Sequence, residues 1–457
     1  MFDFILYEDV PSALTIDLIV LVICTVLLVR YGRLTHSHPA VIYLFFHVLV
    51  IPSRLLAIIS GADTLYSNWG WVFEPVAEAE IVRATILGDV VLIIMTAAWI
   101  TASRVSVKRN AEKPKGSATA PATLSLRHIW TVVVIAFPIG VAGLALIGNV
   151  PGFEKPDIDF AEWQESSWVF ITTSWAGLSL LALIYWYGFR WWLAVPTGAY
   201  LFIMSIQGFH RFRAIIPVIL LIQIYLDRRQ KKWPPVYIMA VIAAAMLFFY
   251  PMKEIGRMAQ EGATVTEISE SSTEILREVA AGQSGDQTLL DQFASSLTLI
   301  DRAGRLYYGT TYLALLTSPI PRQWWPEKPG LADYQKDFST PSRPMGQMGM
   351  VMTFMGEFYL NFGYFGIVIM SFLTAYWLGR IYFVAYRSSY YSVLRFGYLL
   401  IACNLIQVYR DGLGSLFIFT VINMMPLSII VVLHLIRPAS ARRTAMSLYD
   451  LPVSQKE

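Results

Sequence analysis

Long apolar stretches recur along the chain, and short polar connectors separate them. A helix needs about 20 apolar residues to cross about 30 Å of hydrocarbon. Eleven stretches approach or exceed this length, at residues 13–29, 40–58, 81–102, 129–148, 167–187, 191–206, 214–226, 234–251, 360–385, 396–409 and 413–436. The pattern predicts an all-α polytopic membrane protein with about eleven transmembrane helices. The short pair 191–206 and 214–226 leaves open a single re-entrant feature in place of two spans.

Composition and charge agree with this prediction and orient the chain. Hydrophobic residues make up 56% and charged residues 15% of the 457 positions, too few charges for the surface of a soluble globular protein. With the N-terminus outside, alternate connectors place 20 Lys and Arg with 4 acids inside, and 15 with 27 acids outside. The inner side is then +16 and the outer −12, and Asp89, within a span, is the remaining acid of the net charge of +3. The excess of Lys and Arg inside is what the positive-inside rule requires. The basic loop 227–233 favours two separate spans before it. The N-terminus lacks the basic region of a cleavable signal peptide, so we expect the first span to be retained.

One outer connector is much longer than the others. It divides the chain into helices 1–8 (residues 1–251), a large loop (252–358), and helices 9–11 with an inner tail (359–457). Long loops on a compact scaffold often carry function. Helical spacing predicts amphipathic helices over Thr264–Ala280 and over a second stretch with apolar residues at Leu289, Leu290, Phe293, Leu297 and Ile300.

The end of this loop combines aromatic rings with cations. Prolines keep the segment Ser318–Pro329 from forming a continuous helix. Trp324 and Trp325 offer flat faces to a sugar ring, while Arg322 and Lys328 offer charges to a phosphate or a carboxylate sugar. The alternative is an interfacial aromatic belt with snorkelling cations.

Arginines gather near the predicted outer boundary, although the topology rule disfavours cations there. They come from separate parts of the chain: Arg54, Arg83, the connector Gln207–Arg213 with Arg211 and Arg213, and Arg410. Guanidinium groups match phosphate oxygens, so this set indicates a pyrophosphate ligand. The alternative is that each arginine pairs with a local carboxylate or a lipid headgroup.

Glu357 and His210 are the candidate bases at the same boundary. Glu357 precedes the ninth span, where it can deprotonate a hydroxyl group or only anchor the helix. His47 and Asp89 lie deep in predicted spans, which leaves open a buried polar pair, packing or a proton relay.

From about residue 200 to 417, the order of motifs resembles the O-antigen polymerase family, the Wzy-type oligosaccharide repeat-unit polymerases. The matching elements are Gly208–Arg213, the large loop, Pro321–Pro329, Glu357–Gly363 and Arg410–Gly412. The first of them departs from the small residues that are usual in the family through Phe209, His210 and Phe212. The resemblance implies a GT-C-like enzyme of the bacterial inner membrane that works at the periplasmic face without metal, nucleotide or other cofactor.

In this family, donor and acceptor are both undecaprenyl-pyrophosphate-linked glycans. The resemblance then implies Arg211, Arg213 and Arg410, with Arg83 and Arg54 nearby, at the pyrophosphate, and Glu357 or His210 as base. Membrane lipids, a chain-length regulator and a flippase are the expected partners, and nucleic acid is not. A related polysaccharide ligase and a glycolipid transporter remain alternatives.

Overall fold

The computed structural model describes most of the chain, and within it the secondary structure is helical. The described residues are 9–62, 76–111, 126–147, 160–206, 212–237, 258, 264–280, 288–317, 320, 324–325, 327, 352–388, 392–416, 420 and 425–428. They form α-helices with short turns and contain no strand, so the all-α prediction is confirmed for this part of the chain.

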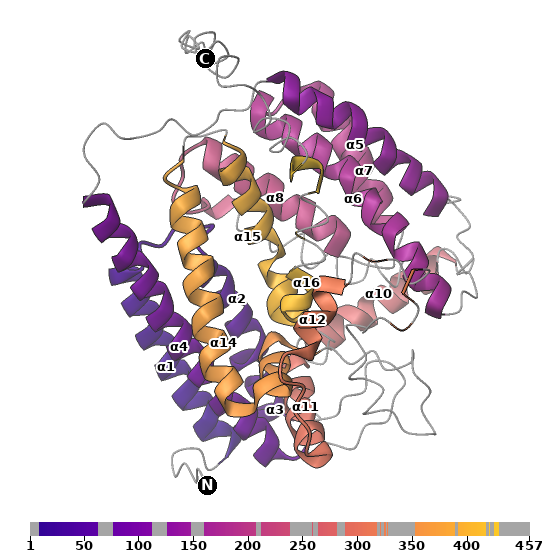
Figure 1. Ribbon diagram of the computed structural model, residues 1–457. Helices are drawn as coiled ribbons and strands as arrows, with labels where there is room; N and C mark the ends of the chain where they lie inside the picture. The colour runs from indigo at the N-terminus through magenta and orange to yellow at the C-terminus, as the bar shows by residue number, and fades with distance from the viewer. Residues whose placement is uncertain are drawn as a thin grey trace.

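The helices form two packed groups (Figure 1). The first contains α1 (Val10–Tyr31), α2 (Pro39–Val50), α3 (Pro52–Ile59), α4 (Glu78–Ala111), α11 (Leu289–Ala303) and α14 (Phe354–Ala385). The second contains α5 (Leu126–Ile147), α6 (Phe160–Tyr187), α7 (Trp191–Ile206) and α8 (Phe212–Arg228). The remaining helices are α10 (Val265–Ala280), α12 (Thr310–Thr317), α15 (Val393–Asp411) and the short α16 (Leu413–Leu416).

Helix α15 joins the two groups because it is apolar on two faces. One face buries Phe396, Leu399, Leu400 and Cys403 in the core of the second group. The other buries Tyr398, Ala402, Leu405, Val408 and Tyr409 in the core of the first group. Both sets follow the three- and four-residue spacing of a helix face. Because α15 is buried on two sides, its C-terminal end, where Arg410 lies, has a fixed position with respect to α14.

Four helical segments of the described structure are long and apolar enough to cross a membrane: Val10–Tyr31, Pro39–Ile59, Glu78–Ser106 and Phe354–Ala385. Val133–Leu144 and Trp191–Met204 are shorter apolar helices. Much of the apolar surface of α1 faces outward, including Ile19, Val22, Ile23 and Val26. Such a surface suits lipid and not water. The count of eleven spans, the GT-C-like arrangement and the position of the loop relative to a membrane stay predictions.

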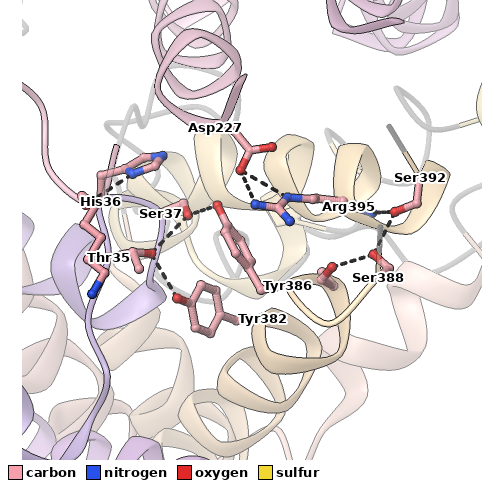
Figure 2. Close-up of polar contacts among 11 residues, drawn as sticks. Thr35, His36, Ser37, Asp227, Tyr382, Tyr386, Ser388, Ser392 and Arg395 are labelled. Carbon is pink, nitrogen blue, oxygen red and sulfur yellow. Dashed lines mark hydrogen bonds and ion pairs between the residues drawn. The ribbon is translucent and has the colours of Figure 1, made fainter. Parts of the chain in front are cut away.

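Three of the connectors that the charge count assigned to the inner side, at residues 30–38, 227–233 and 380–395, contact one another (Figure 2). Arg395 at the start of α15 donates through Nε to Asp227 of α8 at 3.1 Å, and its guanidinium lies 4.2 Å from the ring centroid of Tyr386. Tyr386 also contacts Ser37, between α1 and α2, and Thr35 bonds to Tyr382 at 2.9 Å. The ends of α1, α8 and α14 and the starts of α2 and α15 therefore lie at one level. These contacts agree with alternate connectors, while the side that faces the cytoplasm stays a prediction.

Both amphipathic helices predicted in the large loop are present. α10 covers the first predicted stretch and α11 the second. The five apolar residues predicted to share a face of α11 are all buried: Leu289, Leu290, Phe293, Leu297 and Ile300. That face packs against α4 and α14, at the end of the molecule opposite Figure 2. Helix α11 therefore covers the end of the first group where the candidate site residues gather.

Candidate functional site

Glu357 anchors the turn that follows α15. It lies in the first turn of α14, which begins after Thr353, whose side chain accepts a hydrogen bond from Gly356 N–H at 3.2 Å. Oε2 of Glu357 accepts the backbone N–H of Leu413 at 2.5 Å, and the carboxylate also accepts the N–H of Gly414. Two motifs that lie more than fifty residues apart in the sequence are thereby in direct contact.

Gly412 permits this contact. Its φ of +93° and ψ of 176° lie in a region that only glycine adopts readily. A Cβ atom at this position would overlap with Oε2 of Glu357 and lie 3.0 Å from its Cδ. The glycine of the Arg410–Gly412 motif is therefore required both for the backbone conformation and for space beside the carboxylate.

Arg410 is held at the same turn and remains partly exposed. Its Nη1 lies 3.0 Å from Oδ1 of Asp411, and Asp411 also accepts a hydrogen bond from Gln407. The side chains of Arg410 and Asp411 are 20% and 25% exposed. Arg410 is thus partly exposed beside a turn whose backbone is fixed by Glu357.

Asn361 extends the site toward α12, although it was not among the candidate residues predicted from the sequence. Its Nδ2 donates to the carbonyl of Glu357 at 2.8 Å. Its Oδ1 accepts from Gly309 N–H at 3.0 Å and from the Thr311 hydroxyl at 2.9 Å. The sequence does contain a signal for this residue. Asn361 is polar and lies four positions after Glu357, a spacing that places both residues on the same helix face.

A break in α14 explains how the turn before α12 docks there. Gly363 has φ 60° and ψ −146°, which interrupts the helix nine residues after it begins. The carbonyls of Leu360 and Asn361 instead accept the N–H groups of Tyr307 and Tyr308, at 3.1 and 2.9 Å. At the break, hydrogen bonds to the turn before α12 replace hydrogen bonds within α14, and they fix the position of α12.

Tyr312 of α12 is a further polar group beside Glu357. Its hydroxyl is buried and has no hydrogen-bond partner, while its ring stacks on Phe362. Burial raises the pKa of the Tyr312 phenol, and the neighbouring Glu357 carboxylate raises it further. Tyr312 therefore remains a neutral O–H donor at physiological pH, available to an oxygen atom of a ligand.

Arg83 lies at the start of α4, at the same end of the molecule. Its Nη1 is 2.7 Å from Oδ2 of Asp301, at the end of α11. Its Nη2 donates to the hydroxyls of Tyr359 and Tyr364 at 3.0 and 2.8 Å, and its guanidinium lies 5.8 Å from the centroid of each ring. The Arg83 side chain is 27% exposed, and its charge is already paired with Asp301 at the edge of the site.

Arg54 is buried and forms a two-pronged ion pair with Asp291 of α11. Nε donates to Oδ1 at 2.9 Å and Nη2 to Oδ2 at 2.6 Å, and both side chains are at most 1% exposed. Burial raises the pKa of Asp291, and the hydrogen bonds from Arg54 oppose that rise. For Arg54 and Arg83 the structure therefore shows the carboxylate pairing that the sequence analysis left open, and the carboxylates come from the large loop.

Several predicted site residues lie outside the described part of the chain: His210, Arg211, Arg322 and Lys328. The backbone of Arg213 belongs to the first turn of α8, and its side chain is outside the described structure. Trp324 and Trp325 are exposed, at 81% and 42%. Exposed indole rings suit either a sugar ring or an interface, so both interpretations of this pair remain.

Comparison with known proteins assigns no family to this chain. No protein family, curated protein or solved structure matches this chain. The resemblance to O-antigen polymerases accordingly rests on the sequence motifs and stays a prediction.

Proposed function

We propose that this protein is a glycosyltransferase that polymerises undecaprenyl-pyrophosphate-linked oligosaccharide repeat units. The reaction takes place at the periplasmic face of a bacterial inner membrane and builds a surface polysaccharide. The observation that carries the proposal is the contact between Glu357 and the turn after Arg410, which unites two of the motifs of the resemblance in one partly exposed site. The apolar helices of TM length supply the membrane setting that a lipid-linked substrate requires.

In the proposed reaction, a hydroxyl oxygen of the acceptor sugar forms a bond to the anomeric carbon of the donor. The bond from that carbon to the pyrophosphate oxygen breaks, and the lipid pyrophosphate leaves with the electron pair. Arg410, with Arg211 and Arg213, stabilises the negative charge that grows on the leaving group, more in the transition state than in the ground state. The hydroxyl proton passes to a base.

Glu357 and His210 are the candidate bases, and the geometry gives Glu357 a second task. Its carboxylate already accepts two backbone N–H groups, which fixes the position of Arg410. Tyr312 adds a neutral donor on the same side of α14. Trp324 and Trp325, with Arg322 and Lys328, would receive the acceptor sugar through ring stacking and charge. Arg54 and Arg83 hold α11 in place; Arg54 is buried in its ion pair, while the partly exposed Arg83 stays a candidate at the pyrophosphate.

The test is elongation of a synthetic lipid-linked repeat unit by the purified protein in nanodiscs. We expect a ladder of products from the wild type, and only the single repeat unit from Arg211→Ala and Arg213→Ala. Arg277→Ala, on the exposed surface of α10, is the matched control and should give the wild-type ladder. Normal chain lengths from both variants would refute the assignment. Transfer of a preformed polymer to a lipid A acceptor, without elongation, would identify the related ligase instead.

A glycolipid transporter is the second candidate function, because the structure contains two features that transport mechanisms use. Helix α14 is broken at Gly363, and Asp17, His47 and Asp89 form a buried ionisable cluster. The same nanodisc preparation, rebuilt as sealed vesicles, separates the two functions. A transporter would move a fluorescent lipid-linked glycan across the bilayer without lengthening it.

A further inference from the structure

Three buried side chains from three helices converge inside the first helix group. Asp17 comes from α1, His47 from α2 and Asp89 from α4, and one ligand atom from each lies within 4.8 Å of the other two. Nε2 of His47 is 2.8 Å from Oδ1 of Asp17. Asp89 lies eleven residues after the start of α4, about 16 Å along the helix axis. The cluster is therefore inside segments that are long and apolar enough to cross a membrane.

The charge of the cluster is costly where it lies. Asp17, His47 and Asp89 are 0%, 1% and 2% exposed. With a neutral imidazole, these three side chains alone carry two negative charges, and with an imidazolium they carry one. Ionised groups in a membrane interior are expensive unless opposite charge compensates them. A single divalent cation would bring the three side chains to zero net charge.

The hydrogen bonds of the cluster leave two of its buried polar atoms unsatisfied. Oδ2 of Asp17 and Nδ1 of His47 are buried and have no hydrogen-bond partner. Each carboxylate offers oxygen lone pairs, and a neutral imidazole offers the lone pair of one nitrogen while the other nitrogen keeps its proton, so the three side chains can supply three ligand atoms to one metal ion. The hydroxyl of Tyr43, which is also buried without a partner, interacts electrostatically with both carboxylates.

We propose that Asp17, His47 and Asp89 bind one divalent transition-metal ion, with Zn²⁺ as the best fit. Imidazole and carboxylate together suit Zn²⁺, which takes three protein ligands and a water molecule in an open tetrahedral site. Zn–N and Zn–O bonds of about 2.0–2.2 Å place tetrahedral ligand atoms about 3.3–3.5 Å apart. To reach this geometry, separations of up to 4.8 Å contract by at most about 1.3–1.5 Å, and the 2.8 Å separation of His47 Nε2 and Asp17 Oδ1 widens by about 0.5–0.7 Å.

The cation site is separate from the proposed glycosyl-transfer site and connects to it through aromatic rings. The Tyr43 ring centroid lies 5.9 Å from that of His47, 5.8 Å from Phe354 and 5.1 Å from Tyr409. Phe354 begins α14 three residues before Glu357, and Tyr409 precedes Arg410. The ion would tie α1, α2 and α4 together directly beneath the elements that hold Glu357 and Arg410, so it acts on the fold of this region and takes no part in the proposed reaction.

The test uses the untagged full-length protein in detergent, stripped with a chelator and titrated with Co²⁺ as a spectroscopic substitute for Zn²⁺. We expect one Co²⁺ per chain, with the visible absorption of a tetrahedral site, and displacement by Zn²⁺. Zn²⁺ alone should also raise the thermal unfolding midpoint of the stripped wild type, because it binds the folded state. This second measurement needs no variant.

Variants locate the ion within the chain. His47→Gln and Asp89→Asn should each weaken Co²⁺ binding by about 100-fold or more, since even outer-shell changes cost about 10–100-fold. The control is Asp9→Asn, at the exposed start of α1, which replaces Asp by Asn as Asp89→Asn does and keeps a side-chain acceptor at the helix cap. This variant should bind Co²⁺ as tightly as the wild type. The proposal is overturned if the folded wild type binds no divalent ion, if it takes up protons alone, or if His47→Gln and Asp9→Asn bind Co²⁺ equally well.

Discussion

Replacing Gly412 with alanine tests the contact on which the proposed site depends. Gly412 has φ +93° and ψ 176°, and a Cβ there would overlap with Oε2 of Glu357. Gly412→Ala must therefore strain the backbone and displace the Glu357 carboxylate at the same time. Because Glu357 fixes the turn behind Arg410, the displaced carboxylate should also release Arg410 from its position.

The magnitude follows from the two effects. A residue with a side chain in this region of φ and ψ costs about 1–3 kcal/mol. Loss of the hydrogen bond from Leu413 N–H leaves a buried carboxyl oxygen without this partner and costs about 1–3 kcal/mol more. We expect Gly412→Ala to lower the free energy of unfolding by about 2–6 kcal/mol and to abolish elongation. Gly414→Ala is the matched control, because its Cβ would lie at an ordinary 3.6 Å from Leu315 Cδ2.

A double-mutant cycle separates the two effects. In a Glu357→Ala background the carboxylate is absent, so Gly412→Ala should cost only the backbone strain of about 1–3 kcal/mol. Equilibrium unfolding in detergent, followed by tryptophan fluorescence, measures each corner of the cycle, and the nanodisc assay measures elongation. If the two substitutions are additive, or if Gly414→Ala is as harmful as Gly412→Ala, then Glu357 does not hold this turn.

Three further predictions concern the elements around the site. Asp291→Ala removes the carboxylate that the buried Arg54 binds, and should lower the free energy of unfolding by about 3–5 kcal/mol, whereas Arg54→Met combined with Asp291→Leu should change it much less; equal losses would refute this view. Burial lowers the pKa of His38 to about 3, below the value of about 6.5 in the unfolded chain, so stability should fall as the pH decreases below 6.5, by at most about 1.4 kcal/mol per pH unit. His38→Asn, which can still cap Ala40 N–H, should reduce that slope between pH 7 and 5, while His36, whose pKa burial also lowers, keeps its own contribution; an unchanged slope would contradict the assignment. Asn361→Ala leaves Gly309 N–H without its acceptor and should speed amide hydrogen exchange there, while the part of α14 after the break stays protected; protection at Gly309 equal to the wild type would show that Asn361 does not dock this turn.

The sequence predicted individual helices well, because their periodicity is a local property. The stretch with Leu289 and Ile300 formed α11 with its predicted face buried. Glu357 and Arg410 were found as candidates through their place at the ends of apolar stretches. Their contact was not predictable, since it depends on the positive φ of Gly412 and on the packing of α15 against α14, which no local pattern encodes.

Partners that lie far apart in the sequence were also beyond prediction. Arg54 pairs with Asp291, 237 residues away, and the outer connectors hold many other acids that satisfied the same rule. Asp17 was missed for a different reason. It was counted with the outer charges, although a carboxylate four residues into an apolar stretch is itself a signal of a buried polar partner. The structure supplied that partner as His47.

The outer arginines divide into two kinds, and the division explains why an acidic loop accompanies them. Arg54 and Arg83 bind Asp291 and Asp301, which lie at the two ends of α11, so the two ion pairs attach this helix of the large loop to α3 and α4. A buried pair such as the first contributes little net stability but is costly to break, and so it specifies where the helix docks. Arg410 pairs with its neighbour Asp411 and stays partly exposed. Arg83 is also partly exposed, so an anionic substrate can compete for Arg410 and Arg83 and not for the buried Arg54. The proposed reaction therefore uses the arginines near α8 and α15 for chemistry and Arg54 for the position of the loop, while Arg83 can serve both purposes.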